Sequence, residues 1–286
     1  MQNSVDVSII AANYNNGKYL NEFIGSVLNS TVLPMELILI DDGSTDNSLE
    51  VLDEFKETPF IKVIRFPENR GFTEALNAGI AAATGKYIMR ADPDDLLMPE
   101  RIHLQFQFME SHPEVDVSGS NALYFHSSNG SFINKTNFPV EDKNIKRAYR
   151  RGEHGILHAT AIIKKTLSDK YHYHKIFPSE DYEIFSRMVR DGYTFFNLAE
   201  PLYKVRVHSG SSTTNLRIET IRQTFGFRDQ IFETKTHPLR VFIYYQYIKH
   251  YRSYQMAENN YSRYLHLAIS AIMYPAKIWN RLVNHR

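Results

Sequence analysis

The chain contains no cysteine and only one tryptophan among its 286 residues, and its formal net charge is only +1. The absence of cysteine excludes disulfide bonds and thiolate chemistry, and it fits a reducing compartment. A net charge this small argues against a protein that binds nucleic acid through its overall charge. No apolar run is long enough to span a bilayer, and Met1 to Asp6 lacks a signal-peptide pattern. We therefore expect a cytoplasmic protein, either free or attached peripherally to the inner face of the cell membrane.

The first part of the chain alternates strand-like and helix-like segments. Leu37–Ile40 is a continuous apolar run, as expected for a strand that is covered on both faces. Such βαβα alternation predicts an α/β fold with a mostly parallel sheet flanked by helices, and ligands bind at the carboxyl ends of its strands. The other expected elements here are strands at Val5–Ala12, Lys62–Arg65 and Tyr87–Arg90 and helices at Asp46–Lys56 and Gly71–Ala83. Two further helices are expected, one with Leu20, Phe23, Ile24, Val27 and Leu28 on one face and one that starts at Pro99.

The pattern changes near Val115, where segments become shorter and more polar, and again after Thr214. We therefore predict a domain over residues 1–214, made of halves 1–114 and 115–214, and a helical C-terminal extension over 215–286. The elements expected in the second half are strands at Val115–Ser118, Ala122–His126, Ala159–Ile163 and Tyr203–His208 and a helix at Glu180–Val189.

The run Asp92-Pro93-Asp94-Asp95 directly follows an expected strand. Residues two apart in an extended segment point the same way, so Asp92 and Asp94 can face one ligand. Crowded carboxylates repel one another unless they are exposed or surround a divalent cation. The run is therefore either an acidic loop, in which Asp95 caps the next helix, or a metal site.

A second acidic pair, Asp41-Asp42, follows the apolar strand and leads into Gly43 and Ser44. A carboxylate at this position can accept a hydrogen bond from a nucleobase or from ribose hydroxyls. The alternative is a turn followed by a helix cap. That alternative explains Gly43 and Asp46 well, but it explains the paired aspartates poorly.

These segments, in this order, resemble the family 2 glycosyltransferases, which have the nucleotide-sugar-binding GT-A fold. The resemblance covers roughly residues 5–212. It is carried by Val7–Asn15, the Asp41–Asp46 turn, Asn69-Arg70-Gly71 with Asn77-Ala78-Gly79, Asp92–Asp95 with Pro99-Glu100-Arg101, and Ser179-Glu180-Asp181.

The resemblance implies roles for several residues in donor binding. Tyr14 would pack on the nucleobase, Asp42 would contact the base, and Asp92 would contact the ribose and the metal shell. Asp94 would bind Mn²⁺ or Mg²⁺ directly, and oxygen ligands suit both cations. Arg70 can pair with the donor phosphates, as can Arg90 and Arg206, although structural ion pairs explain these arginines equally well.

The resemblance also implies roles at the acceptor side. Asp181 matches the general base, and Glu180 would orient it or support the acceptor. An ordinary acidic helix N-terminus is the alternative for both carboxylates. His158 would lie near the acceptor, and His208 would reach the metal or the diphosphate. Either histidine can instead be hydrogen-bonded within the fold.

The sequence thus predicts an inverting, metal-dependent glycosyltransferase. We expect it to use a nucleoside diphosphate sugar, most simply a UDP-sugar, and to extend a glycan or a lipid-linked acceptor in surface polysaccharide synthesis. One alternative is a nucleotide- or carbohydrate-binding module without turnover. Another is a metal-dependent phosphoryl-transfer enzyme, but Asn13-Tyr14-Asn15 follows the first strand where such enzymes carry a nucleophilic aspartate.

The C-terminal part is basic and rich in tyrosine. Residues 240–286 contain seven lysine and arginine residues but only one acidic residue, Glu258. Apolar residues recur at helical spacing in two sets, which are Val241, Tyr244, Tyr245 and Ile248, and Leu265, Ile269 and Ile272. This pattern favours helices that dock on an anionic membrane surface. Packing on the catalytic domain, or on a second subunit in a homo-oligomer, is the alternative.

Overall fold

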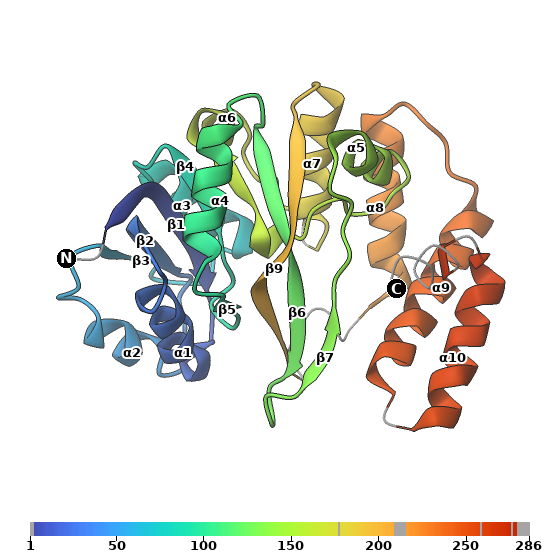
Figure 1. Cartoon of the computed structure of the whole chain (residues 1–286), viewed down its shortest axis with the longest axis horizontal. Coiled ribbons are helices and arrows are strands. Elements are labelled where there is room, and N and C mark those ends of the chain that lie inside the picture. The colour runs from blue at the N-terminus through green and yellow to red at the C-terminus, as the bar shows by residue number, and fades with distance from the viewer. Residues whose placement is uncertain (1–2, 177, 209–215, 258, 276, 279–286) are drawn as a thin grey trace.

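The structure is a computed structural model that describes residues 3–176, 178–208, 216–257, 259–275 and 277–278. Within these residues, nine strands form one sheet in the order β3-β2-β1-β4-β8-β6-β9-β5, with β7 paired to β6. Figure 1 shows the N-terminal strands and helices at one end, the long β6 and β9 in the centre, and the C-terminal helices at the other end.

The strands and helices follow the expected alternation. The strands are β1 Ser4–Asn13, β2 Leu33–Asp41, β3 Ile61–Arg65, β4 Tyr87–Arg90, β5 Leu96–Leu97, β6 Val117–His126, β7 Phe132–Lys135, β8 Ile162–Lys164 and β9 Phe195–Val207. The α-helices are α1 Gly17–Leu28, α2 Ser48–Glu54, α3 Phe72–Ala82, α4 Arg101–Ser111, α5 Asp142–Arg150, α6 Lys165–Lys170, α7 Glu180–Arg190, α8 Ile218–Ile231, α9 Pro238–Met256 and α10 Asn260–Met273.

The sheet is mixed. The pairs β1–β2, β2–β3, β1–β4 and β6–β9 are parallel, whereas β8 runs antiparallel to both β4 and β6. Alternate residues of β2 enter two apolar clusters: Ile38 packs with α3 on one face, and Leu37 packs with α1 on the other. Because both faces are covered, the central run Leu37–Ile40 of β2 is apolar without interruption, as the sequence predicts. The predicted fold class is confirmed.

Several elements of the second half differ from expectation. One continuous strand, β6, replaces the two predicted strands, because β9 pairs with it along its whole length from Val117 to His126. Residues His158–Thr160 form a 3₁₀-helix, and only Ile162–Lys164 of that segment is extended. β9 begins eight residues before the predicted strand at Tyr203.

The C-terminal helices pack on one another, and α8 also packs on α7. Val241, Tyr244 and Tyr247 of α9 are buried in an apolar cluster that also contains Phe225 of α8. The first of the two apolar faces predicted to meet a membrane is therefore used mainly inside the protein. None of the helices in the described part of the chain is both long and apolar enough to cross a bilayer. The predicted domain boundary at 214–215 and residues 279–286 lie outside the described residues.

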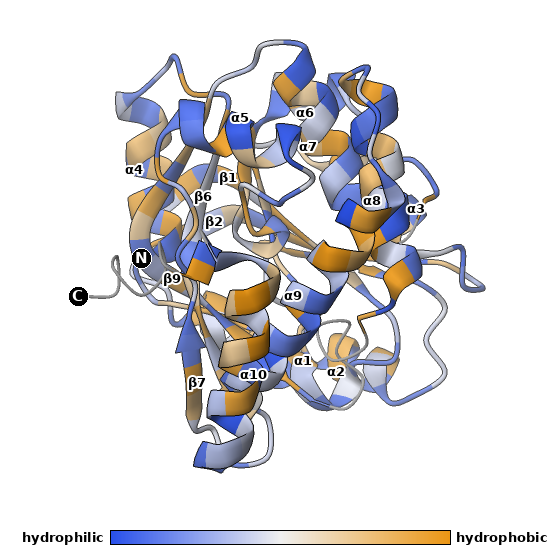
Figure 2. Ribbon diagram, turned by 90° about the vertical axis from the view of Figure 1, so that its right-hand side faces the viewer, coloured by the Kyte–Doolittle hydropathy of each residue, from blue (hydrophilic) through white to orange (hydrophobic). Residues whose placement is uncertain are grey.

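Figure 2 views the molecule from the side of α9 and α10, where polar and apolar residues alternate along both helices. On α10, large hydrophobic side chains remain exposed. These are Tyr261, Tyr264, Leu265 and Ile272. Their spacing of three, one and seven residues places them along one side of the helix.

Candidate active site

The carboxyl ends of β1 and β2 are joined by side-chain hydrogen bonds. Asn13 Nδ2 donates to Asp41 Oδ1 at 2.8 Å, and Ser44 Oγ donates to the same oxygen at 2.6 Å. Gly43 has φ of +69°, and a Cβ there would lie 2.5 Å from the carbonyl carbon of Glu68. Asp41 and Gly43 therefore fix the turn, which leaves the neighbouring Asp42 as the residue available for another role.

Asp42 is buried, and its carboxylate accepts hydrogen bonds from the backbone N–H groups of Arg70 and Gly71 at 2.7 and 2.9 Å. It thereby holds the chain where α3 begins. The two oxygens of a carboxylate accept about four hydrogen bonds, so acceptor capacity remains for a ligand. Tyr14 is 46% exposed beside this turn. The Arg70 guanidinium lies 4.7 Å from the ring centroid of Phe66.

The acidic run begins with an ion pair between Asp92 and Arg90. Tyr203 Oη accepts a hydrogen bond from the Asp92 backbone N–H at 2.8 Å. Arg90 is only 2% exposed, yet neither Nε nor one terminal nitrogen has a hydrogen-bond partner among the described residues. A buried guanidinium with unused donors is costly unless a ligand completes its hydrogen bonds.

The rest of the run is tied to the end of β9. His208 Nε2 lies 3.0 Å from Asp94 Oδ2, and the Arg206 backbone N–H donates to Asp95 Oδ1 at 2.7 Å. Burial and the negative charge of Asp92 raise the pKa of Asp94. Burial and the charges of Asp94 and Asp92 raise the pKa of Asp95 well above its usual range. Like charges therefore oppose one another here, which favours a bound cation.

Glu180 and Asp181 begin α7. Asp181 Oδ2 lies 3.5 Å from His154 Nδ1, and Asp181 Oδ1 accepts a hydrogen bond from the Tyr182 N–H at 2.7 Å. Glu180 is 6% exposed, and its Oε2 has no hydrogen-bond partner within the described chain. Burial and the charge of Asp181 raise the pKa of Glu180 to about 8. Burial and the adjacent Asp181 therefore favour the protonated form of Glu180.

His158 is buried, and its Nε2 lies 2.6 Å from the hydroxyl of Tyr173. Burial and the charges of Arg90 and His154 lower the pKa of His158 well below its usual range, so the ring is neutral. This arrangement matches the alternative given for His158, namely a histidine that is hydrogen-bonded within the fold. Its contact with the acceptor remains a prediction.

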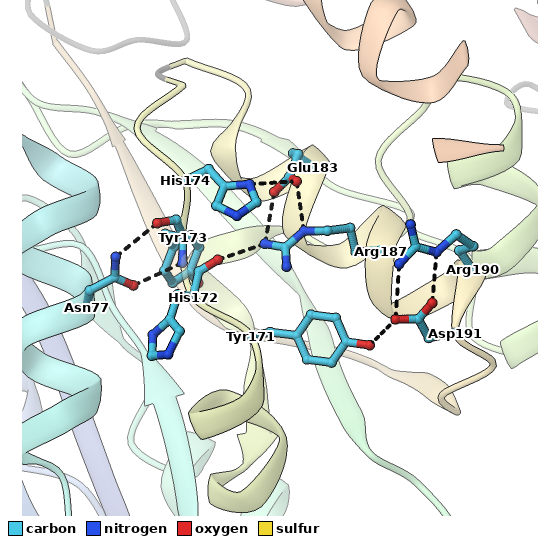
Figure 3. A network of polar contacts seen from close by, with 9 residues as sticks. All are labelled: Asn77, Tyr171, His172, Tyr173, His174, Glu183, Arg187, Arg190 and Asp191. Carbon is cyan, nitrogen blue, oxygen red and sulfur yellow. Dashed lines mark hydrogen bonds and ion pairs between the residues drawn. The ribbon is translucent and has the colours of Figure 1, made fainter. Parts of the chain in front are cut away.

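The loop that carries Tyr173 is fixed on two sides (Figure 3). Asn77 of α3 exchanges two hydrogen bonds with the Tyr173 backbone, each 2.9 Å long. On the other side, Arg187 of α7 donates to the His172 carbonyl oxygen at 2.7 Å and pairs with Glu183. The loop is therefore fixed between α3 of the first half and α7 of the second half.

Electrostatic effects connect the two predicted carboxylate groups. The positive charge of Arg90 lowers the pKa of Glu180, and the negative charge of Asp92 raises it. Arg90 also lies over the ring of Phe72, which follows the Gly71 amide bound by Asp42. The three acidic segments are thus brought to one region of the molecule rather than to separate surfaces.

The residues present fit a divalent cation that is completed by a substrate. Among the described residues, no group of three acidic, histidine or cysteine side chains is placed to hold a metal by itself. Magnesium sites at nucleotides commonly use one or two carboxylates and take further oxygens from substrate phosphates and water. Asp94 and the adjacent His208 supply such a partial set.

Two residues near this region have no site role predicted from the sequence, and a third, Arg90, has one only beside the alternative of a structural ion pair. His154 and Tyr173 lie in irregular segments, where no periodicity distinguishes them. Arg90 was considered only as one of several arginines. Its position at the last residue of a four-residue buried strand, two residues before the acidic run, is the signal that separates it from Arg70.

Comparison with known proteins identifies the fold and the family. Structures with the same fold include residues 1–349 of S. aureus TarS with UDP-GlcNAc (TM-score 0.63, 16% identity, 98% of this chain and 92% of that chain). Another is the mannosyltransferase PcManGT of Pyrobaculum calidifontis with GDP-Man and Mn²⁺ (TM-score 0.59, 16% identity, 98% and 79%). The protein therefore has the GT-A fold.

Residues 8–171 match the family described as Glycosyl transferase family 2. The chain belongs to this family and is a glycosyltransferase. It is 32% identical over 213 residues to the putative glycosyltransferase EpsE of Bacillus subtilis, a match that spans 73% of this chain and 76% of that protein. It is 29% identical over 215 residues to the amylovoran biosynthesis glycosyltransferase AmsE of Erwinia amylovora, spanning 73% and 79%.

The raised pKa of Glu180 has a consequence for stability. The pKa of a glutamate is about 4.3 in the unfolded chain, whereas that of Glu180 is about 8 in the folded protein. The contribution of protonated Glu180 to the free energy of unfolding is therefore full below about pH 4 and is lost as the pH rises to about 8. Glutamine does not ionise. We expect the melting temperature of Glu180→Gln to equal that of the wild type near pH 4 and to exceed it by several degrees at pH 9. Thermal unfolding across this pH range measures the difference. A melting difference that is independent of pH would contradict the assignment.

Proposed function

We propose that the protein is an inverting, metal-dependent glycosyltransferase that uses a nucleoside diphosphate sugar. The observation that carries the proposal is the buried Arg90, which pairs with Asp92 of the acidic run and whose charge also acts on Glu180 at the start of α7. Asp94 and His208 would hold Mn²⁺ or Mg²⁺, which offsets charge on the departing diphosphate when bound. Two nitrogens of the buried Arg90 have no hydrogen-bond partner among the described residues, and they would donate to the same negative charge.

Donor recognition follows from the turns at the ends of β1 and β2. Tyr14 presents an exposed ring on which a base can pack, and Asp42 retains acceptor capacity for a base N–H. Uracil offers its N3–H, so a UDP-sugar is the proposed donor. Arg70, exposed at the entry to α3, would reach the phosphates, and Asp92 the ribose.

The transfer step uses Asp181 as the general base. Its carboxylate removes the proton from the acceptor hydroxyl while the acceptor oxygen bonds to the anomeric carbon of the donor sugar. The bond from that carbon to the diphosphate oxygen breaks, and the nucleoside diphosphate leaves with the electron pair. A single displacement inverts the anomeric carbon. Protonated Glu180 would donate a hydrogen bond to the acceptor, and neutral His158 would support that side through Tyr173.

The name of AmsE, which refers to amylovoran biosynthesis, supports a role in extending a surface polysaccharide or a lipid-linked glycan. The decisive experiment is a panel of nucleotide sugars tested with and without Mn²⁺ or Mg²⁺. We expect one UDP-sugar to raise the melting temperature only when metal is present and to be hydrolysed slowly. A protein that binds no member of the panel would contradict the proposal, and binding without any turnover would support a non-catalytic module.

A membrane-bound acceptor is consistent with the exposed side of α10. The proposal is that Leu265 and Ile272, with neighbouring tyrosines and basic residues, rest on an anionic membrane surface. We expect Leu265→Glu/Ile272→Glu to reduce flotation with phosphatidylglycerol vesicles by about tenfold, because two apolar contacts are replaced by charges that the lipid repels.

The matched control is His103→Glu/Gln107→Glu, which adds the same charges to the exposed side of α4. Flotation of this control should equal that of the wild type. If the α10 variant floats normally but changes its elution in size-exclusion chromatography, the exposed side of α10 instead forms a homo-oligomer contact.

A further inference from the structure

A cavity of about 620 Å³ lies between the catalytic part and the C-terminal helices. Its lining comes from β7 and the segment after it, from α5 and the following loop, and from α9. These elements face one another in Figure 1. The volume is within the range of about 300–1,000 Å³ that is typical of small-molecule sites.

The cavity adjoins the proposed catalytic base. His154 is part of its lining, and Nδ1 of the same residue lies 3.5 Å from Asp181 Oδ2. One side chain therefore touches both the cavity and the carboxylate that would activate the acceptor. A ligand in the cavity can therefore place a hydroxyl near Asp181.

The lining is strongly basic. Five of its side chains carry positive charge and one carries negative charge: Lys135, Arg147, Arg151, Arg252 and Lys277 against Glu153. Lys277 already pairs with Glu153 at 2.5 Å. Arg147 and Arg151, one helical turn apart and both exposed, have no acidic side chain within 4 Å among the residues that the structure describes. Two adjacent guanidinium groups suit a dianion, which phosphate supplies.

The remaining lining suits a sugar. Tyr251 contributes a partly exposed side chain that combines an apolar ring with a polar hydroxyl, and it stacks on the buried Tyr247. Asn134 and Asn137 contribute amides, which both donate and accept hydrogen bonds. The apolar C–H faces and the hydroxyl groups of a saccharide match these two kinds of side chain.

We propose that this cavity binds the acceptor, and that the acceptor is a saccharide carrying a phosphate group, which Arg147 and Arg151 hold while a hydroxyl reaches Asp181 past His154. The assignment rests on the proposed transferase function. The C-terminal helices are then part of the acceptor site, because α9 forms one wall of it.

The test compares trehalose 6-phosphate with trehalose by isothermal titration calorimetry, with UDP and Mn²⁺ present to fill the donor site. We expect the phosphate to bind the wild type at least about tenfold more tightly than the uncharged sugar, because charge-assisted hydrogen bonds form only with the phosphate. Arg147→Glu/Arg151→Glu should abolish that preference.

Arg150→Glu is the matched control, because Arg150 is an exposed arginine of the same helix that lies outside the cavity lining. Arg150→Glu should keep the preference for trehalose 6-phosphate over trehalose. If Arg147 and Arg151 only stabilised the C-terminal end of α5, Arg150→Glu would lose this preference as well, and that result would contradict the proposal. Equal affinity of the wild type for the two sugars would overturn the proposal. The thermal shift given by UDP and Mn²⁺ tests the proposed donor function separately. If UDP and Mn²⁺ give no shift, the donor function is contradicted. A titration of the two sugars without nucleotide then still tests whether the cavity binds a phosphorylated sugar.

Discussion

Replacement of Asp181 with asparagine is expected to lower sugar transfer by about 100- to 10,000-fold, the range attributed to a positioned general base. Asparagine has nearly the same shape, and its side-chain oxygen can still accept the hydrogen bond from the Tyr182 N–H. It cannot accept the acceptor's proton. Steady-state transfer of labelled sugar, with the donor identified by the nucleotide-sugar panel, measures the effect.

Donor binding is the internal control for this variant. Asp181 contacts His154 and the start of α7 rather than the acidic run, so the metal-dependent thermal shift should match that of the wild type. Glu180→Gln, one residue away, should retain transfer at neutral pH because Glu180 is already neutral there. Normal transfer by Asp181→Asn would remove Asp181 as the base, whatever its effect on melting.

The N-terminal half could be predicted from the sequence because its signals are local. The apolar run Leu37–Ile40 lies within a strand covered on both faces, and the predicted strand at Tyr87–Arg90 is observed with the same bounds. The second half depends on pairing between distant segments. Leu96–Leu97 is a strand only because it pairs with Lys204 and Tyr203, and no pattern in two residues predicts that.

The helix α5 was missed for a different reason. It is polar apart from a few residues, and its packing rests on two buried side chains, Ile145 and Tyr149, at a spacing of four. Two apolar positions are too few to establish a helical period. The cavity could not be predicted from the sequence either. Arg147 and Arg151 form part of a site only because α9, which is distant in the sequence, lines the same cavity.

The proposed site shows the same division. Asp42, Asp94 and Asp181 follow strands or begin a helix, so the α/β pattern already brings them toward one edge of the sheet. The sequence does not reveal that the pKa of Glu180 is raised, because burial in the fold and the nearby Asp181 together raise it. Nor does it reveal that His158 is neutral and bound to Tyr173, which requires the fold of a separate loop.

Replacement of Asp94 with alanine is expected to remove metal-dependent nucleotide binding. Asp94 is the carboxylate next to His208, and without it the site keeps one nitrogen ligand for a cation that prefers oxygen. We expect UDP affinity in Mn²⁺ to fall at least about tenfold, which corresponds to about 1.4 kcal/mol. Calorimetric titration of UDP with Mn²⁺, and with EDTA in its place, measures the change.

The folded state should not suffer from this replacement, because burial and the charge of Asp92 raise the pKa of Asp94 and the loss of one carboxylate relieves that repulsion. Glu100→Ala is the matched control: it removes an exposed carboxylate six residues further on that makes no capping hydrogen bond to α4. Both variants should melt near the wild type without ligand, and only Asp94→Ala should bind UDP equally with and without metal. Retention of the Mn²⁺ effect in Asp94→Ala would place the cation elsewhere and would separate the acidic run from donor binding.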